Sequence, residues 1–392
     1  MAYIYVTQNR FCADDSTALR IRTFCQILHE LDKEVIVVSL DENTNHVVHD
    51  FKGIKYVTLR NPSNSFVSRL MNLVLHRPRL RKSINRLMED YKIEGVFFYD
   101  LPPLSTVFLK NYARNQNIKI FHDSVEWYSA VQFKWGKIAL PYLLKNILNS
   151  YLIDQQVRVF AISKYLHSYF KSKEISATRI PIVMDTQNIV WEKKKNSDKL
   201  VLMYAGTPGK KDYLNEIIVG LSELSESDLA RIELNIFGVT ESQLIKDCDV
   251  SVQTLEICGK SLVAHGRVKR TSVMEHLQRS DFTILLRSAK LRYAKAGFPT
   301  KVVESLATAT PVICNITSDL GDYLIDGENA LIVKDCSSIE LRKTLKKALS
   351  LSLEEKQRLS SNARKTAENY FDYRTYIEQF NSFILSNENG DR

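Results

Sequence analysis

One short stretch in the second half of the chain joins a turn to two residues of opposite charge. In "AKAGFPTKVVESLATATPVICN" (295–316), a Gly-Phe-Pro turn precedes a segment with apolar residues at helical spacing. A helix is expected to begin at Pro299 or Thr300, because proline is tolerated in a first helical turn. The unpaired N–H groups at such a helix start attract anions. The candidate ligand contacts here are Gly297, Phe298, Pro299, Thr300, Lys301 and Glu304.

Lys301 and Glu304 are three residues apart and would share one face of that helix. A carboxylate beside a phosphate would repel it, so Glu304 makes chemical sense only if it accepts hydrogen bonds from hydroxyls, such as the diol of a ribose. The simpler alternative is an exposed Lys-Glu pair on an ordinary helix. The pattern alone leaves both open.

Lys210 and Lys211 follow an apolar run in "VLMYAGTPGKKD" (201–212). Two ammonium groups beside a diphosphate leaving group would stabilise the charge that grows as a bond to it breaks. A solvated turn is the alternative. Other candidate contacts lie where apolar runs end, at Gly206, Gly238 and Arg287.

In the first half, His122, Asp123 and Glu126 follow the apolar run "IKIFH" (118–122). An imidazole there could hydrogen-bond a hydroxyl group of a ligand, with either carboxylate as its orienting partner or as a base. A lone histidine at a strand end is also often structural. These three residues are the catalytic candidates.

Two basic segments in the first half could contact an acceptor or a surface. Arg20 and Arg22 open the first long helix and could bind an acceptor phosphate, or lie on the surface as ordinary arginines. The segment 68–88 carries six Lys or Arg and no acid, which suits an anionic membrane surface, although Pro78 should split or kink any helix there. The segment 135–153 could add an apolar contact, or be a packed helix. No nucleic-acid motif accompanies these charges, so nucleic acid is not expected as a partner.

The elements that must position these residues form two series. Apolar runs that are not alternating, typical of buried parallel strands, recur at 3–6, 35–40, 95–99, 118–122 and 158–163. A second series of strand-like runs follows at 199–206, 231–238, 282–287, 311–315 and 330–333. The lysine-rich stretch 191–198 separates the two series. We predict two Rossmann-like α/β domains, residues 1–190 and 198–368, followed by a helix over 369–386 that crosses back to the first domain. In open parallel sheets ligands bind at the carboxyl ends of strands, where the candidate residues lie.

Composition narrows the class of protein further. The chain has 392 residues, 44% of them hydrophobic, and a net charge of +9, which favours an anionic partner. None of the six cysteines forms a C-x-x-C pair, and no Asp-x-Asp pair stands out at a strand end, so neither a metal nor another cofactor is expected. No signal peptide or membrane-spanning run is evident, which favours a cytoplasmic location.

The segment 295–316 resembles the nucleotide-sugar site of retaining family 4 glycosyltransferases of the bacterial surface polysaccharide type. That site has a Glu, then Gly-Phe, a second Glu eight positions after the first, and a small-residue helix end before "G-T-P-V-I". Gly297-Phe298, Glu304 and "ATATPVI" (307–313) match, while Ala296 replaces the first Glu and Thr207 replaces the usual Arg of the glycine turn. Weaker matches in the family's order are 118–128, 160–170, 180–185, 201–212, 234–238, 265–268 and 280–287.

The resemblance implies a GT-B fold and transfer of a sugar, with retention of configuration, from a nucleoside diphosphate sugar. It places Glu304 on the ribose, the lysines on the diphosphate and His122 near the sugar or acceptor. The acceptor would be a glycan, such as a lipid-diphosphate-linked oligosaccharide, at the inner face of the cytoplasmic membrane. Two alternatives stay open: a GT-B sugar-nucleotide epimerase, which needs no acceptor, and a catalytically silent paralogue that acts as a binding partner.

Overall fold

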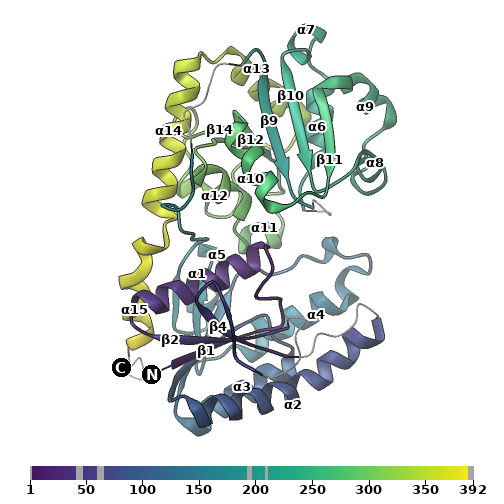
Figure 1. Cartoon of the computed structure of the whole chain (residues 1–392). Coiled ribbons are helices and arrows are strands. Elements are labelled where there is room, and N and C mark those ends of the chain that lie inside the picture. The colour runs from purple at the N-terminus through teal and green to yellow at the C-terminus, as the bar shows by residue number, and fades with distance from the viewer. Residues whose placement is uncertain (1, 41–46, 60–65, 192–196, 208–210, 387–392) are drawn as a thin grey trace. The chain divides into compact units, whose positions relative to one another are not determined.

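The computed structural model describes residues 2–40, 47–59, 66–191, 197–207 and 211–386. The chain divides into two compact units, residues 1–184 with 373–392, and residues 185–372 (Figure 1). The second unit therefore begins before the lysine-rich stretch, most of which (192–196) lies outside the described residues. Each unit has its own parallel sheet flanked by helices, as the sequence predicts.

The sheet of the first unit has eight strands in the order β3-β4-β2-β1-β5-β6-β7-β8, and only the β3–β4 pair is antiparallel. Every residue of β1 is buried, as expected for a central strand covered on both faces. The strands are β1 (Ala2–Thr7), β2 (Glu34–Ser39), β3 (His49–Phe51), β4 (Ile54–Thr58), β5 (Ile93–Tyr99), β6 (Lys119–Ser124), β7 (Arg158–Ala161) and β8 (Ala177–Arg179). The helical segments are α1 (Ser16–Glu30), α2 (Phe66–Asp90), α3 (Pro103–Gln116), η1 (Ala130–Gln132), η2 (Gly136–Ile138), α4 (Leu140–Ile147), η3 (Leu148–Leu152), α5 (Lys164–Lys171), η6 (Tyr373–Tyr376) and α15 (Ile377–Leu385).

The sheet of the second unit has six parallel strands in the order β11-β10-β9-β12-β13-β14. They are β9 (Leu200–Ala205), β10 (Ile232–Phe237), β11 (Leu262–Gly266), β12 (Phe282–Leu285), β13 (Val312–Cys314) and β14 (Ala330–Ile332). Its helical segments are α6 (Leu214–Ser222), α7 (Glu226–Leu229), α8 (Glu241–Cys248), α9 (Val252–Cys258), η4 (Gly259–Ser261), α10 (Arg270–Arg279), α11 (Arg292–Ala296), α12 (Thr300–Ala307), η5 (Leu320–Asp322), α13 (Ser338–Ser350) and α14 (Leu353–Tyr370). Helix α12 begins at Thr300, one of the two expected positions.

Helix α2 runs through Pro78 without interruption, so of the two predicted outcomes, a split or a kink, the split does not occur. Beyond the proline, Leu80, Ile84 and Leu87 are buried at helical spacing. Packing of this apolar stripe outweighs the one backbone hydrogen bond that proline removes.

The expected single terminal helix is interrupted. Helix α14 ends at Tyr370 and α15 begins at Ile377. Between them, the Asp372 carboxylate accepts hydrogen bonds from the backbone N–H of Thr186 (3.1 Å) and from its hydroxyl (2.5 Å), within the second unit. The remainder returns to the first unit, where Phe380 of α15 packs against Phe24 and Phe160 with ring centroids 5.2 and 4.6 Å apart.

Candidate active site

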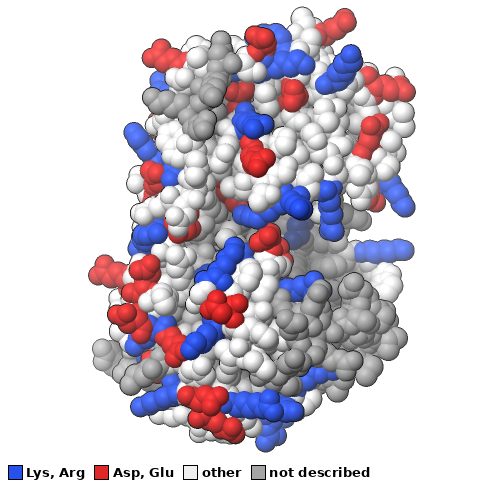
Figure 2. All heavy atoms as spheres, in the orientation of Figure 1, with Lys and Arg blue, Asp and Glu red and all other residues white. Residues whose placement is uncertain are grey.

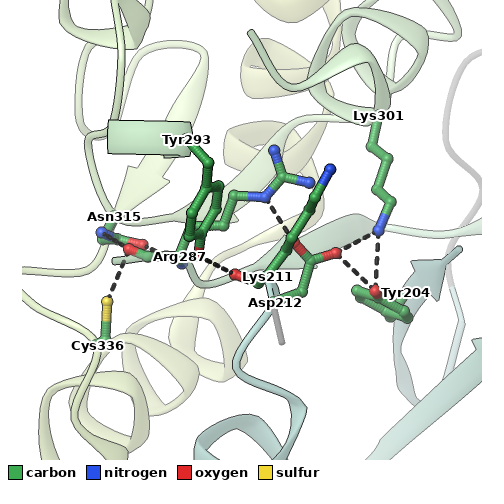
Figure 3. A network of polar contacts seen from close by, with 8 residues as sticks. All are labelled: Tyr204, Lys211, Asp212, Arg287, Tyr293, Lys301, Asn315 and Cys336. Atoms are coloured by element: carbon green, nitrogen blue, oxygen red, sulfur yellow. Dashed lines mark hydrogen bonds and ion pairs between the residues drawn. The ribbon is translucent and has the colours of Figure 1, made fainter. Parts of the chain in front are cut away.

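A buried carboxylate, Asp212, holds two cations at the carboxyl ends of the strands of the second unit (Figure 3). The Nε of Arg287 donates to Asp212 Oδ1 at 2.6 Å, and the ammonium of Lys301 pairs with Oδ2. The hydroxyl of Tyr204 donates to the same Oδ2 at 2.7 Å. The Lys301 ammonium also lies over the Tyr204 ring, 4.2 Å from its centroid. We call these four residues the Asp212 cluster.

The sheet order explains why residues far apart in sequence meet here. Tyr204 is near the end of β9, Arg287 follows the neighbouring strand β12, and Lys301 lies in the first turn of α12. Asp212 forms an isolated antiparallel bridge with Arg287, which brings the segment after β9 against the end of β12.

Side chains on the other side of the cluster fix the two backbone segments. Asn315 accepts from the backbone N–H of Arg287 at 2.9 Å and donates to its carbonyl at 2.8 Å. The Cys336 thiol donates to the same carbonyl, and the Tyr293 hydroxyl donates to the carbonyl of Lys211 at 2.6 Å. The cluster is therefore held from both segments before any ligand arrives (Figure 3).

The charges of the Asp212 cluster do not cancel. One carboxylate faces two cations, and while Asp212 is 1% exposed, the side chains of Arg287 and Lys301 are 17% and 27% exposed. Burial alone would raise the pKa of Asp212, but Lys301 and Arg287 outweigh it and hold that pKa well below its ordinary value. Burial, with a smaller effect of Arg287, lowers the pKa of Lys301 although Asp212 opposes the shift. The cluster carries a net positive charge with both cations partly accessible.

Two glycines bring the backbone close to this charge. Gly206, directly after β9, has φ +140°, and a β-carbon on it would lie 2.6 Å from the Lys301 ammonium nitrogen. Gly238, directly after β10, has φ +100°, and a β-carbon there would lie 2.5 Å from the carbonyl oxygen of Gly206. Both φ values disfavour a side chain, and at Gly238 the neighbouring backbone also leaves no room for one. Both positions were predicted from the sequence as donor contacts.

Glu304 lies one turn beyond Lys301 on α12 and pairs with Arg270, at the start of α10. Sequence reasoning missed Arg270. Exposed basic residues Arg267 and Lys269 precede it, directly after β11. Figure 2 shows Lys and Arg side chains gathered on the second unit at the level where β9, β10 and β11 end. Glu304 therefore lies beside cations, with one of its oxygens engaged by Arg270.

The other predicted donor contacts differ in their environment. Lys210 lies outside the described residues, and Lys211 is half-buried. Gly297 ends α11 in extended backbone, and Pro299 precedes the first turn of α12. Phe298 is buried against Tyr323 and Phe371, with centroids 5.9 and 5.7 Å apart, so the structure makes it an anchor of the turn and not a ligand contact.

Two predicted site residues of the first unit, Arg20 and Asp123, lie in its core. Arg20 and Asp123 are both buried and form an ion pair, Nη2 to Oδ1 at 2.8 Å. The Tyr5 hydroxyl donates to Asp123 at 2.9 Å, and Arg20 also donates to the carbonyl of Pro181 at 2.7 Å. Arg20 is thus a core residue and not an acceptor contact. Asp123 likewise is not exposed to act as a base.

The environments of the other three candidates in the first unit, His122, Arg22 and Glu126, bear on their predicted roles. His122 is fully buried and stacks on Phe98 at 4.7 Å. Burial, reinforced by Lys145, lowers the pKa of His122 to about 3, so it is neutral at pH 7. Arg22 is half-buried and donates to the carbonyls of Phe11 and Ala13 at 2.9 and 2.8 Å. Glu126 is half-buried, accepts from the Tyr128 hydroxyl at 2.6 Å, and stays a catalytic candidate.

Comparison with known proteins identifies the second unit. Residues 185–366 match the family model described as "Glycosyl transferases group 1". Residues 185–366 therefore form a group 1 glycosyl transferase unit, and the chain is a glycosyltransferase. The match spans β9 to most of α14, so it includes the Asp212 cluster and Glu304. No curated protein matches the sequence.

Solved structures match the fold of this glycosyltransferase over nearly its whole length. Sucrose-phosphate synthase from Thermosynechococcus elongatus aligns with a TM-score of 0.74 and 14% identity, covering 97% of this chain and 98% of that one. HepE from Anabaena, solved with UDP and glucose, gives 0.68 and 12%, covering 97% and 98%. WaaG, described as a glycosyltransferase of lipopolysaccharide biosynthesis, gives 0.68 and 12%, covering 98% and 100%. The predicted GT-B fold is confirmed.

Two properties of the described residues concern metal binding and membrane spanning. No group of three or more His, Cys, Asp or Glu there is arranged to hold a metal ion. No helix in the described part of the glycosyltransferase is long and apolar enough to cross a membrane.

Proposed function

We propose that this glycosyltransferase moves a sugar from a nucleoside diphosphate sugar to a hydroxyl of a glycan acceptor, with retention of anomeric configuration. The observation that carries the proposal is the charge imbalance of the Asp212 cluster, where Arg287 and Lys301 share one carboxylate. A diphosphate contributes the negative charge that the cluster lacks. Retention follows from the family resemblance of 296–313, and NMR of the product anomer tests it.

The cluster suits a diphosphate leaving group in particular. Its cations are fixed by Asp212 and the Tyr204 ring before the ligand binds, so no reorganisation is needed as charge develops on the phosphates. The Lys301 ammonium fills the space left by the missing side chain of Gly206, so a phosphate bound to this ammonium would also lie close to the backbone at Gly206. These groups would supply the stabilisation that a metal ion provides in other enzymes, so we propose metal-independent transfer. A chelator would then leave the rate unchanged.

Glu304 is proposed to hold the ribose of the donor. It lies one turn from Lys301 on the same helix, which is about the separation of a nucleotide's ribose from its phosphates. Its pairing with Arg270 fixes one carboxylate oxygen and leaves lone pairs for a diol. Because HepE was solved with UDP, UDP is the first nucleotide to test.

The acceptor is proposed to be a lipid-linked glycan used in cell-surface polysaccharide synthesis, reached from the inner face of the cytoplasmic membrane. Support comes from α2, whose Arg77, Arg81, Lys82 and Arg86 are exposed. Each basic residue near an anionic leaflet adds about 1 kcal/mol of attraction. Glu126 is the described acceptor-side residue that remains available to position the hydroxyl.

Titration with UDP and with 2′-deoxy-UDP tests the proposed function. The wild-type enzyme should bind UDP several-fold more tightly, because Glu304 loses a hydroxyl partner in the deoxy analogue. Glu304→Gln should bind the two ligands with nearly equal affinity. The matched control is Glu340→Gln, which removes the carboxylate that pairs with Lys343 on α13. This variant should still bind UDP more tightly than 2′-deoxy-UDP.

Two results would contradict this proposal. Absence of binding to uridine, guanosine, adenosine and thymidine diphosphates would refute a nucleotide site altogether. Conversion of a nucleotide sugar in the absence of any acceptor would replace transfer by epimerisation.

A further inference from the structure

The burial pattern of helix α4 is the reverse of that expected for a helix on a water-exposed surface. Its basic residue Lys145 is buried and pairs with Asp100, Nζ to Oδ1 at 3.0 Å. Leu140, Leu143 and Ile147, on a face three and four residues apart, are exposed. Surface helices of soluble proteins place these residue types the other way round.

The exposed apolar face continues on both sides of α4. Before it, Trp135 and Ile138 are 64% and 75% exposed, and after it Tyr151 is 79% exposed. We call these six residues, Trp135, Ile138, Leu140, Leu143, Ile147 and Tyr151, the apolar surface. A contiguous group of exposed apolar residues marks a site that another molecule or a membrane covers.

The charge around the apolar surface favours an anionic binding partner. Residues 128–153 contain no Asp or Glu, while Lys134 and Lys137, which flank Trp135 in the sequence, are exposed. The basic helix α2 belongs to the same face of the sheet. The connections β4–α2–β5, β5–α3–β6 and β6–α4–β7 all step the same way across it, so right-handed crossovers place α2, α3 and α4 on one side.

We propose that the apolar surface inserts into the interfacial region of an anionic lipid bilayer. Trp and Tyr are enriched at that depth because their rings are amphipathic. Aliphatic residues beside lysines complete the pattern of a helix that lies in the interface and does not span it. This inference concerns a surface other than 68–88, and it holds whether or not the acceptor carries a lipid.

Vesicle sedimentation of the full chain tests the proposal. Wild-type protein should bind vesicles of phosphatidylcholine with phosphatidylglycerol, and bind phosphatidylcholine alone more weakly. Ile138→Asp should weaken binding to the mixed vesicles by about tenfold or more, because a carboxylate is excluded from the apolar side of the interface. Ile257→Asp, at a 52% exposed isoleucine of α9, is the matched control and should bind like wild type.

Trp135 supplies a direct readout of insertion. Its fluorescence should shift to the blue on the mixed vesicles, and the shift should disappear in Trp135→Leu. UDP affinity measured on Ile138→Asp should equal that of wild type, which separates failure of this surface from failure of the nucleotide site.

Three outcomes would overturn the proposal. Wild-type protein could fail to bind either vesicle, or Ile138→Asp could bind as well as wild type. Alternatively, the wild-type protein could bind no vesicles and form a dimer in sedimentation equilibrium, and Ile138→Asp could dissociate that dimer. This outcome would assign the surface to a second copy of the chain.

Discussion

The two units each contain a buried aspartate held by a tyrosine of the unit's first strand and by an arginine. In the first unit Tyr5 of β1 and Arg20 bind Asp123, and in the second Tyr204 of β9 and Arg287 bind Asp212. The difference is one residue, Lys301, which adds a second cation to Asp212.

That difference separates a structural ion pair from a candidate binding site. Arg20 and Asp123 balance each other and are inaccessible, so they join the core of their unit. The Asp212 cluster keeps a net positive charge, and its cations reach the surface. A surplus of accessible charge, and not the presence of an ion pair, is therefore the better sign of a ligand site.

The largest effect on stability is expected in the first unit. Asp123→Ala leaves the buried guanidinium of Arg20 without its counter-ion, which should cost about 3–5 kcal/mol of unfolding free energy. Denaturant unfolding followed by circular dichroism measures it. Lys347→Ala breaks an exposed pair with Asp326 and should cost under about 1 kcal/mol. Equal losses in both variants would mean that the burial of the first pair has no energetic consequence.

A glycine of the second unit should give the next largest effect. In Gly238→Ala the new methyl group meets the carbonyl of Gly206 at 2.5 Å in a backbone conformation that favours glycine. The expected loss of unfolding free energy is about 2–3 kcal/mol. Gly327→Ala, at φ +76° with no atom within 4 Å of the new methyl, isolates the conformational part and should lose less. A loss at Gly327 as large as at Gly238 would rule out the steric contact as the cause.

Removal of one hydroxyl should produce a smaller effect that sharpens the comparison. Tyr204→Phe deletes a hydrogen bond to Asp212 and should cost about 1.5–3 kcal/mol, as should Tyr5→Phe at Asp123. Only Tyr204→Phe should also weaken UDP binding, because its hydroxyl contacts the Lys301 ammonium at 2.9 Å. Isothermal titration of both variants decides the matter, and weaker UDP binding in Tyr5→Phe would undo the distinction between the two aspartates.

The mildest effect is expected from pH. Burial lowers the pKa of Lys301 below its usual 10.5, so its charge is present at neutral pH and is lost on the alkaline side earlier than that of an ordinary lysine. UDP affinity should therefore fall as pH rises toward 10.5, while Lys301→Arg, which keeps its charge, should flatten the decline. An unchanged alkaline profile in Lys301→Arg would exclude Lys301 as the titrating group.

Much of the fold could be predicted because central parallel strands are apolar on both faces. β9 is an unbroken apolar run and β1 is apolar up to its last residue, and the glycines after β9 and β10 lie where strand ends must turn. Strands β3 and β4 were missed, because β3 is a three-residue edge strand and β4 interrupts its apolar residues with the exposed Lys55.

The candidate site was predicted only in outline. Lys301, Arg287 and Gly206 were identified individually, but Asp212 was not, since an aspartate after two lysines looks like part of a solvated turn. Arg20 and Asp123 are 103 residues apart, and nothing in their local sequence indicates that they pair. Strand ends indicate where polar residues gather, whereas the partner of each charge depends on the packing of several elements.

The most direct test of the account compares UDP with uridine in Lys301→Gln and in wild type. If the surplus charge of the Asp212 cluster binds a diphosphate, UDP affinity should fall by about tenfold or more while uridine affinity stays unchanged. Lys347→Gln, at an exposed lysine paired with Asp326, should alter neither affinity. Unchanged UDP affinity in Lys301→Gln, or an equal loss for UDP and uridine, would contradict the account.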